Sequence, residues 1–172
     1  MFDIIKSETE LLERLPERTP AIKNLSKLPQ LDYFYLLFIS GHQGREITPD
    51  IVLYGYEDAL RENRLLEAKY PDISSTFWLI GTTGQGDSWF LDRKNGSVLF
   101  FDHEQGDYEG ADQFLRLGIS FSNFLRLAFL FAVLEELLDS RDLDLSEIEE
   151  FKAAINRIQP GLYALYPFDY FK

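Results

Sequence analysis

The chain has 172 residues, of which 45% are hydrophobic and 27% are charged, as is typical of one globular domain and not of a disordered chain. Its 17 basic and 29 acidic residues give a net charge of −12, which argues against DNA or RNA as the main ligand and fits a cationic partner or simple solubility. There is no cysteine, the N-terminus lacks a secretory-signal pattern, and the longest uncharged apolar run, residues 127–134, is far shorter than the ~20 residues of a membrane span. We therefore expect a cytoplasmic protein with no membrane partner.

Capping signals predict two short helical segments near the N-terminus. Ser7 and Glu10 form an S-x-x-E capping box, which predicts a helix over residues 8–15 that the next proline ends. Thr19 and Pro20 are a second start signal, a capping hydroxyl followed by proline at the first helical position. They predict another helical segment that closes at the following proline.

Residues 31–40 are open to two interpretations. Their aromatic and almost continuous apolar character suits a buried strand. Pro29 suits the start of a helix, Asp32 its first turn, and Gly41 the position just after its end. We favour the helix.

The middle of the chain alternates loop, strand and helix. Residues 42–46 have the composition of a loop, and residues 51–54 that of a short strand. Residues 57–70 have helical composition and no breaker until Pro71, so we expect a helix that ends there.

The clearest β signal predicts an antiparallel meander of three strands, at residues 77–81, 88–92 and 97–102. A glycine-rich connection joins the first two strands, and an Asn-Gly pair, a strong hairpin signal, joins the second and third. The residues expected to build these turns are Gly81, Gly84, Gly86, Asp87, Asn95 and Gly96. We predict an α+β fold, a single domain whose antiparallel sheet has this meander at its core and is flanked by helices.

A long helix should follow the polar loop after the meander. Ser120 or Ser122 can cap it, and it should run to residue 138. Apolar residues cover so much of its girth that we expect it to be deeply packed on the sheet. The side chains expected to pack are Phe124, Ala128, Phe131, Val133, Leu134 and Leu138.

The last part of the chain should be a C-terminal extension, residues 140–172, of the single domain formed by residues 1–172. Ser146 and Glu149 form another capping box, which predicts a helix to residue 158. The tail that follows has five aromatic residues among its last ten. This tail either docks on its own chain or mediates a homodimer, so both a monomer and a homodimer remain open.

The glycine-rich segment, residues 81–87, resembles a phosphate-binding loop at first sight. Gly81 and Gly86 have the P-loop gap, but Asp87 and Ser88 follow where that motif needs lysine and serine. The aspartate would repel a phosphate, and a strand rather than a helix follows, so no helix N-terminus faces an anion. We therefore interpret the segment as a tight turn.

Other catalytic or metal-binding patterns are weak. Four carboxylates lie near strand ends of the meander, but no spacing pairs two of them for acid–base chemistry. Neither histidine stands in a zinc-ligand spacing, and residues 102–104 would at most attract a weakly held divalent ion. The residues concerned are Asp87, Asp92, Asp102, Glu104, His42 and His103. We expect no enzyme activity, no catalytic residue, no cofactor and no metal site.

Acidic residues gather in two stretches. Residues 102–112 hold five acids and no Lys or Arg, and residues 132–151 hold eight acids and one Arg. Two interpretations remain open, a solvated surface that keeps an aromatic-rich chain soluble or a docking surface that steers a basic protein. For the docking surface we select the first stretch with two aromatic anchors, as partner-binding residues Asp102, Glu104, Asp107, Tyr108, Glu109, Asp112 and Trp89.

Residues 72–127 carry a composite pattern. An apolar strand ends in Ile-Gly, a Gly/Asp turn and an aromatic strand ending in Leu-Asp follow, and then come a Gly turn, a third strand, a His-Glu step and a Ser-Phe-x-x-Phe-Leu segment. These are residues 80–81, 84–87, 89–92, 95–96, 97–102, 103–104 and 120–125. The pattern resembles the central part of SUKH-superfamily domains, as do Leu28-Pro29 and the segment after them, although Ser40-Gly41 stands where that family has Asn-Gly.

The resemblance implies an α+β sheet flanked by helices and supports the helix over residues 31–40. It implies a bacterial immunity protein that binds and neutralises a cognate toxin domain, such as a nuclease. The alternative is a regulatory protein-interaction adaptor related to fungal regulators of cell-wall synthesis. The family is not known for catalysis, so the resemblance transfers no catalytic residue. The expected partner is a basic protein toxin.

Overall fold

Six strands of the computed structural model, which describes residues 1–171, form one antiparallel sheet in which neighbours in sequence are neighbours in space. The strands are β1 (Arg45–Thr48), β2 (Ile51–Leu53), β3 (Phe77–Thr82), β4 (Ser88–Asp92), β5 (Val98–Phe101) and β6 (Leu115–Arg116). The helices are α1 (Glu8–Glu13), α2 (Tyr33–Gly41), α3 (Tyr56–Lys69), α4 (Pro71–Thr76), α5 (Phe121–Ser140), α6 (Leu145–Ile158) and α7 (Leu162–Leu165), with two 3-10 turns, η1 (His103–Gln105) and η2 (Ala111–Gln113). The predicted α+β fold and its β3–β4–β5 meander are confirmed.

The central strands are buried on both faces of the sheet. Because strand side chains alternate, Trp78 and Ile80 of β3 enter a large cluster with α2, α5 and α6, whereas Phe77 and Leu79 enter a smaller one on the other face. Side chains of α3, α4 and the segment after β5 complete the smaller cluster. Burial on both faces is why these strands have continuous apolar sequences.

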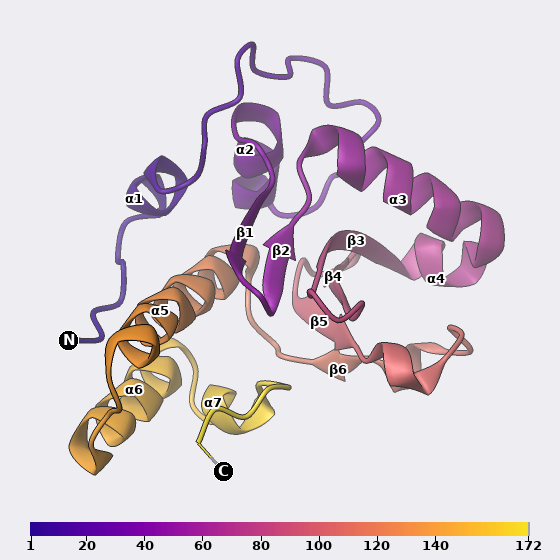
Figure 1. Ribbon diagram of the computed structural model, residues 1–172. Helices are drawn as coiled ribbons and strands as arrows, with labels where there is room; N and C mark the ends of the chain where they lie inside the picture. The colour runs from indigo at the N-terminus through magenta and orange to yellow at the C-terminus, as the bar shows by residue number, and fades with distance from the viewer. Residues whose placement is uncertain (172) are drawn as a thin grey trace.

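Helix α5 confirms the predicted long helix. The Ser120 hydroxyl caps it by accepting a hydrogen bond from the amide of Asn123, at 3.2 Å. Phe124 and Phe131 are fully buried, but Leu138 is 36% exposed, so the expected packing of that residue is wrong. The helix runs beside β1 and α6 (Figure 1). Within residues 1–171, no helix combines the length and the apolar composition that crossing a membrane requires.

The first two helices form where capping chemistry places them. The Ser7 hydroxyl accepts from the amide of Glu10 at 3.4 Å and begins α1. The Asp32 carboxylate accepts from the amide of Tyr35 at 2.9 Å and begins α2, which confirms the helical interpretation of this segment. The predicted strand at β2 and the predicted helix at α3 are also present.

The second predicted helical segment, residues 20–28, is wrong. The chain here forms no α-helix. Its backbone instead pairs with the end of α2, because the amides of Arg18 and Ile22 donate to the carbonyls of Gly41 and Ser40 at 2.9 and 2.8 Å. A tertiary contact therefore overrides the local Thr-Pro signal.

Other boundaries also differ from expectation. α3 ends just before Pro71, as predicted, but a second helix, α4, begins at this same proline. Proline is well suited to the first turn of a helix. β1 begins at Arg45 inside the expected loop, and the polar loop after β5 contains η1 and η2 before β6 begins at Leu115. The cap of α6 is Asp144, which accepts from the amide of Glu147 at 2.9 Å, and not Ser146.

The aromatic tail docks on its own chain. After α7, the Tyr166 ring stacks on Phe131 with 4.1 Å between centroids. The Tyr170 hydroxyl lies 2.7 Å from an Asp50 carboxylate oxygen and 2.6 Å from one of Glu135. The tail is therefore part of the large hydrophobic cluster.

Candidate functional site

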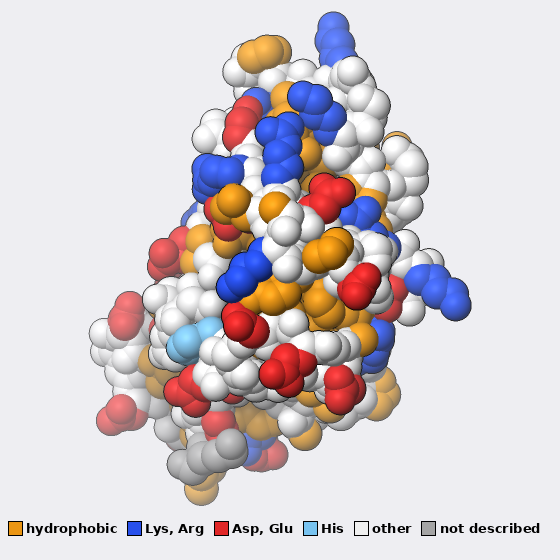
Figure 2. Space-filling view, turned by 90° about the vertical axis from the view of Figure 1, so that its right-hand side faces the viewer, with side chains coloured by type: hydrophobic (Ala, Val, Ile, Leu, Met, Phe, Trp, Pro, Cys, Tyr) orange, Lys and Arg blue, Asp and Glu red, His pale blue; other side chains and the backbone are white. Residues whose placement is uncertain are grey.

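The acidic segment, residues 102–112, connects β5 towards β6 and lies at the lower right of Figure 1. Figure 2 views the molecule from that side. On the face shown there, Lys and Arg side chains gather in the upper half, and Asp and Glu side chains gather in the lower half. The negative charge of the chain is therefore not spread evenly over this face.

Local hydrogen bonds hold the acidic segment in one conformation. Asp102 caps η1 by accepting from the amide of Glu104 at 2.8 Å. The side-chain carbonyl of Gln113 accepts from the amides of Glu109 and Gly110, at 2.8 and 3.3 Å. These bonds fix the turns around η1 and η2, the two short 3-10 helices of this region. Gln113 was not among the residues selected from the sequence, where nothing marks its role.

Tyr108 anchors the segment to the smaller hydrophobic cluster. Its ring lies 4.4 Å from that of Phe101, 4.9 Å from Tyr70 and 5.9 Å from Phe90, between centroids. Burial raises the pKa of its hydroxyl. Since the ring is half-buried, most of its surface packs against the smaller hydrophobic cluster, and only its remaining edge is accessible to a partner.

The expectation that Trp89 is a partner anchor is wrong. Its side chain is fully buried, with its ring 4.8 Å from both Phe100 and Phe124, and its indole N–H donates to the carbonyl of Asp50 at 2.8 Å. The alternation of β4 turns this residue toward α5, where no partner can reach it.

The carboxylates of the acidic segment differ in how far they are neutralised. Asp107 accepts from the Tyr70 hydroxyl and lies 3.3 Å from the Lys69 ammonium, and these two contacts lower its pKa. Among residues 1–171, the other four acids form no ion pair within 4.0 Å. They are Asp102, which is half-buried, and Glu104, Glu109 and Asp112, which are exposed. The segment thus presents uncompensated negative charge to solvent.

A buried carboxylate joins the glycine-rich turn to the start of the acidic segment. One oxygen of Asp87 lies 2.6 Å from His103 Nδ1 and also accepts from the His103 amide at 3.1 Å. The other oxygen accepts from the Thr83 hydroxyl at 2.9 Å. Burial alone would raise the pKa of Asp87, but these hydrogen bonds hold it below its usual value, and the same contact raises the pKa of His103.

Among residues 1–171, one group of three side chains could together hold a metal ion, namely Asp87, Asp102 and His103. One ligand atom from each lies within 4.8 Å of the others. In the structure their contacts are internal, since His103 Nδ1 faces Asp87 and Asp102 caps η1. A cavity of about 350 Å³ adjoins them. Asp92, another strand-end acid considered in the sequence, pairs instead with Arg116 at 2.9 Å.

The Asp87–His103 pair predicts a defined pH dependence. We expect the His103 imidazole to titrate above 6.5 by NMR and to return towards 6.5 in Asp87→Asn. Because the pKa of His103 is raised, the pair stabilises the fold fully below pH 6.5, and this stabilisation is lost as the pH rises through the pKa of His103 in the folded protein. Because the pKa of Asp87 is lowered, its contribution to stability is lost when the pH falls into the acid range. Asp87→Asn should therefore destabilise most between about pH 3.8 and 6.5. An unshifted His103 titration would contradict this pairing.

The remaining turn residues have conformational roles. Gly86 and Gly96 have positive φ angles of 101° and 71°, as expected of at least one glycine in the first turn. The Asn95 side chain accepts from the amide of Ser97 at 2.9 Å. Gly81 is buried against β2, and Gly84 is exposed.

No family model, curated protein or solved structure compared with the chain matches it.

Proposed function

We propose that this chain is a non-catalytic protein-binding module, an immunity protein that binds a basic toxin domain through the acidic segment and so blocks its active cleft. One observation carries the proposal. Unpaired carboxylates, Glu104, Glu109 and Asp112 among them, project from a backbone that Gln113 and Tyr108 hold in place. An ordered charged surface loses little conformational entropy on binding, so it suits recognition of a folded partner.

The charge of the acidic segment suggests how neutralisation would work. A toxin that cleaves nucleic acid must hold phosphates, so its cleft is expected to be lined by Lys and Arg. Carboxylates bound in that cleft would compete with nucleic acid for the same cations. Opposite charge would also raise the association rate above the ~10⁵–10⁶ M⁻¹s⁻¹ of neutral partners, and salt would slow it.

The resemblance of residues 72–127 to SUKH-superfamily domains supports the same function, because many proteins with that pattern are immunity proteins. Regulatory adaptors with the same pattern would also use a non-catalytic surface. The two functions differ in their partner. An immunity protein is expected to protect cells from a toxin domain encoded by the neighbouring upstream gene, and an adaptor is not.

Co-expression provides the test. Cells that produce the toxin domain encoded by the upstream gene should grow when this chain is present. The triple reversal Glu104→Lys, Glu109→Lys and Asp112→Lys should abolish most of that protection while leaving the circular dichroism spectrum unchanged, because these side chains are exposed. Colony counts and growth rates at matched expression levels measure the effect.

A matched control separates the acidic segment from net charge alone. The control variant combines three reversals of exposed residues around the end of α5, Glu136→Lys, Asp139→Lys and Asp142→Lys. It changes the net charge by the same amount as the triple reversal in the acidic segment. This control should protect as well as the wild type. Protection lost in the control and kept in the first variant would move the contact surface to the C-terminal helices. No protection by the wild-type chain would refute the immunity function.

A further inference from the structure

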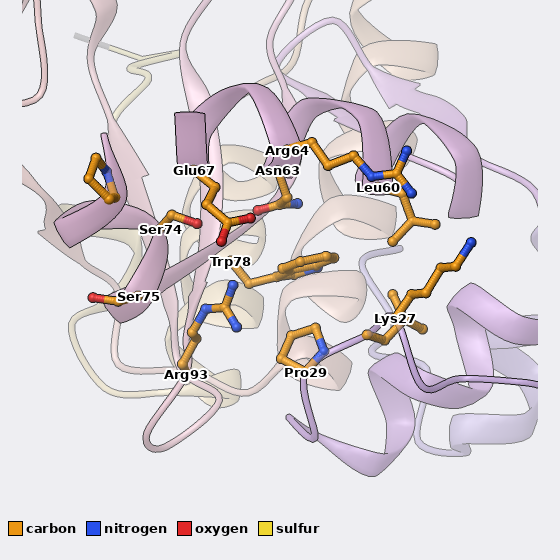
Figure 3. Close-up of a pocket in the computed structure, with 12 residues that line it drawn as sticks. Lys27, Pro29, Leu60, Asn63, Arg64, Glu67, Ser74, Ser75, Trp78 and Arg93 are labelled. Atoms are coloured by element: carbon orange, nitrogen blue, oxygen red, sulfur yellow. The ribbon is translucent and has the colours of Figure 1, made fainter. Parts of the chain in front are cut away.

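A second feature of the molecule, separate from the acidic segment, is a cleft of about 610 Å³. It lies between α3, α4, the turn after β4 and the segment before α2 (Figure 3). The buried residues Trp78, Asn63 and Ser74 contribute to its lining, and Leu60 and Pro29 add apolar surface. The cleft therefore combines an aromatic and apolar lining with a polar rim.

The charge of the cleft is opposite to that of the chain. Three cationic side chains line it, Lys27, Arg64 and Arg93, against one carboxylate, Glu67. In the part of the chain that the structure describes, none of these cations has a carboxylate oxygen within 4.0 Å. Unpaired cations gathered in one concave site are unexpected in a chain whose net charge is −12.

Arg93 is the most constrained of the three cations. Its guanidinium lies over the Trp78 ring, 5.3 Å from the centroid, which favours a defined orientation. Its Nε atom is buried and has no hydrogen-bond partner within residues 1–171. Burial lowers the pKa of Arg93, and the charge of Glu67, which acts in the opposite direction, does not offset this effect. A half-buried and unpaired guanidinium costs free energy, which a bound oxyanion would offset.

The other polar groups of the cleft compete little for that oxyanion. Asn63 is fully engaged, since its amide nitrogen donates to the carbonyls of Ala59 and Leu79 at 2.8 Å each and its oxygen accepts from the Leu79 amide at 2.9 Å. Glu67 faces Arg93 across the cleft but does not pair with it (Figure 3). Lys27 and Arg64 extend toward the other end of the cleft, with the Trp78 indole between the two ends.

We propose that this cleft binds a small ligand that carries an oxyanion group, either a carboxylate or a phosphate. The planar Arg93 fork would donate hydrogen bonds to the oxyanion, Lys27 and Arg64 would attract it, and Leu60 and Pro29 would cover the apolar part of the ligand. The proposal does not depend on the function assigned to the acidic segment. A concave site that combines an aromatic and apolar lining with a few charged groups has the usual features of a small-molecule site.

NMR titration at low ionic strength tests the proposal with two probes, pyrophosphate and succinate. We expect saturable shifts of the Arg93 Nε–H and Trp78 indole N–H signals, with the indole signal of fully buried Trp89 as an internal control. A response to pyrophosphate alone assigns the site to phosphates, and a response to succinate alone assigns it to carboxylates. Arg93→Gln should weaken binding about 10- to 100-fold, as expected on loss of a charge-assisted hydrogen bond.

Two residues of α3 give a matched pair of variants. Arg64→Gln removes a charge that lines the cleft, and Arg61→Gln removes the same charge from an arginine that pairs with Asp58 and Glu62 outside it. Both positions are exposed, so both variants should fold. Only the first should weaken binding, whereas Glu67→Gln should strengthen it. Absence of saturation with both probes, or equal weakening by the two arginine variants, would overturn the proposal.

Discussion

Replacement of Phe131 by alanine should lower the free energy of unfolding by roughly 3–5 kcal/mol, the usual cost of a large cavity in a core. The ring is fully buried and lies 5.1 Å from that of Phe151 in α6 and 4.1 Å from that of Tyr166 in the tail. It is therefore the point where α5, α6 and the C-terminal tail meet. Urea titration followed by circular dichroism would measure the loss.

Leu138→Ala is the control for that prediction. Leu138 belongs to the same helix but is 36% exposed, so its truncation should cost less than about 1 kcal/mol. A similar loss in both variants would mean that α5 is destabilised along its whole length and not at its contact with the tail. A loss below about 1 kcal/mol for Phe131→Ala would place the ring outside the core.

Gly81→Ala should destabilise the fold by about 3 kcal/mol or more, at the upper end for overpacking, because the obstacle is backbone. A Cβ atom at this position would lie 2.4 Å from the carbonyl oxygen of Val52 on the adjacent strand β2. The β2–β3 pairing would have to open, since no flexible side chain can move away. Thermal and urea unfolding would both record the change.

Gly84 and Gly86, in the turn that follows β3, should be less sensitive to substitution than Gly81, which lies in the strand itself. A Cβ atom at Gly86 would lie 3.9 Å from Cγ of His103, an ordinary van der Waals contact, but the residue has a φ of 101°. For Gly86→Ala we therefore expect a loss of about 1–2 kcal/mol from backbone strain alone. Gly84→Ala has an ordinary φ and a nearest contact of 3.5 Å, so it should be nearly neutral. A Gly84 variant as unstable as the Gly81 variant would contradict the structural interpretation of this turn.

Where local chemistry decides the structure, the sequence was sufficient to predict it. The β3–β4–β5 meander follows from apolar runs separated by glycine-rich and Asn-Gly turns, and α1 and α5 follow from their serine caps. β1 and β6 were missed because they are short, partly charged and formed only by pairing with a neighbour. The segment at residues 20–28 was misassigned because hydrogen bonds to the end of α2 outweigh a local helix signal.

The candidate sites depended even more on tertiary contacts. The acidic stretch was visible in the sequence, but no local pattern showed that Asp107 is paired with Lys69. Aromatic content could not distinguish an anchor from a core residue, and it is the register of β4 that buries Trp89. The sequence analysis does not predict the cleft with Arg93, because its lining comes from parts of the chain that lie far apart in sequence.

The association rate with the toxin domain, measured by stopped-flow fluorescence across ionic strength, tests the central claim most directly. If the acidic segment steers a basic partner, the rate of the wild-type chain should fall about tenfold or more between ~10 mM and ~500 mM salt. The triple reversal of Glu104, Glu109 and Asp112 to lysine should associate slowly even at low salt. A wild-type rate that is flat across salt and unchanged by the reversal would contradict a role for the acidic segment in binding.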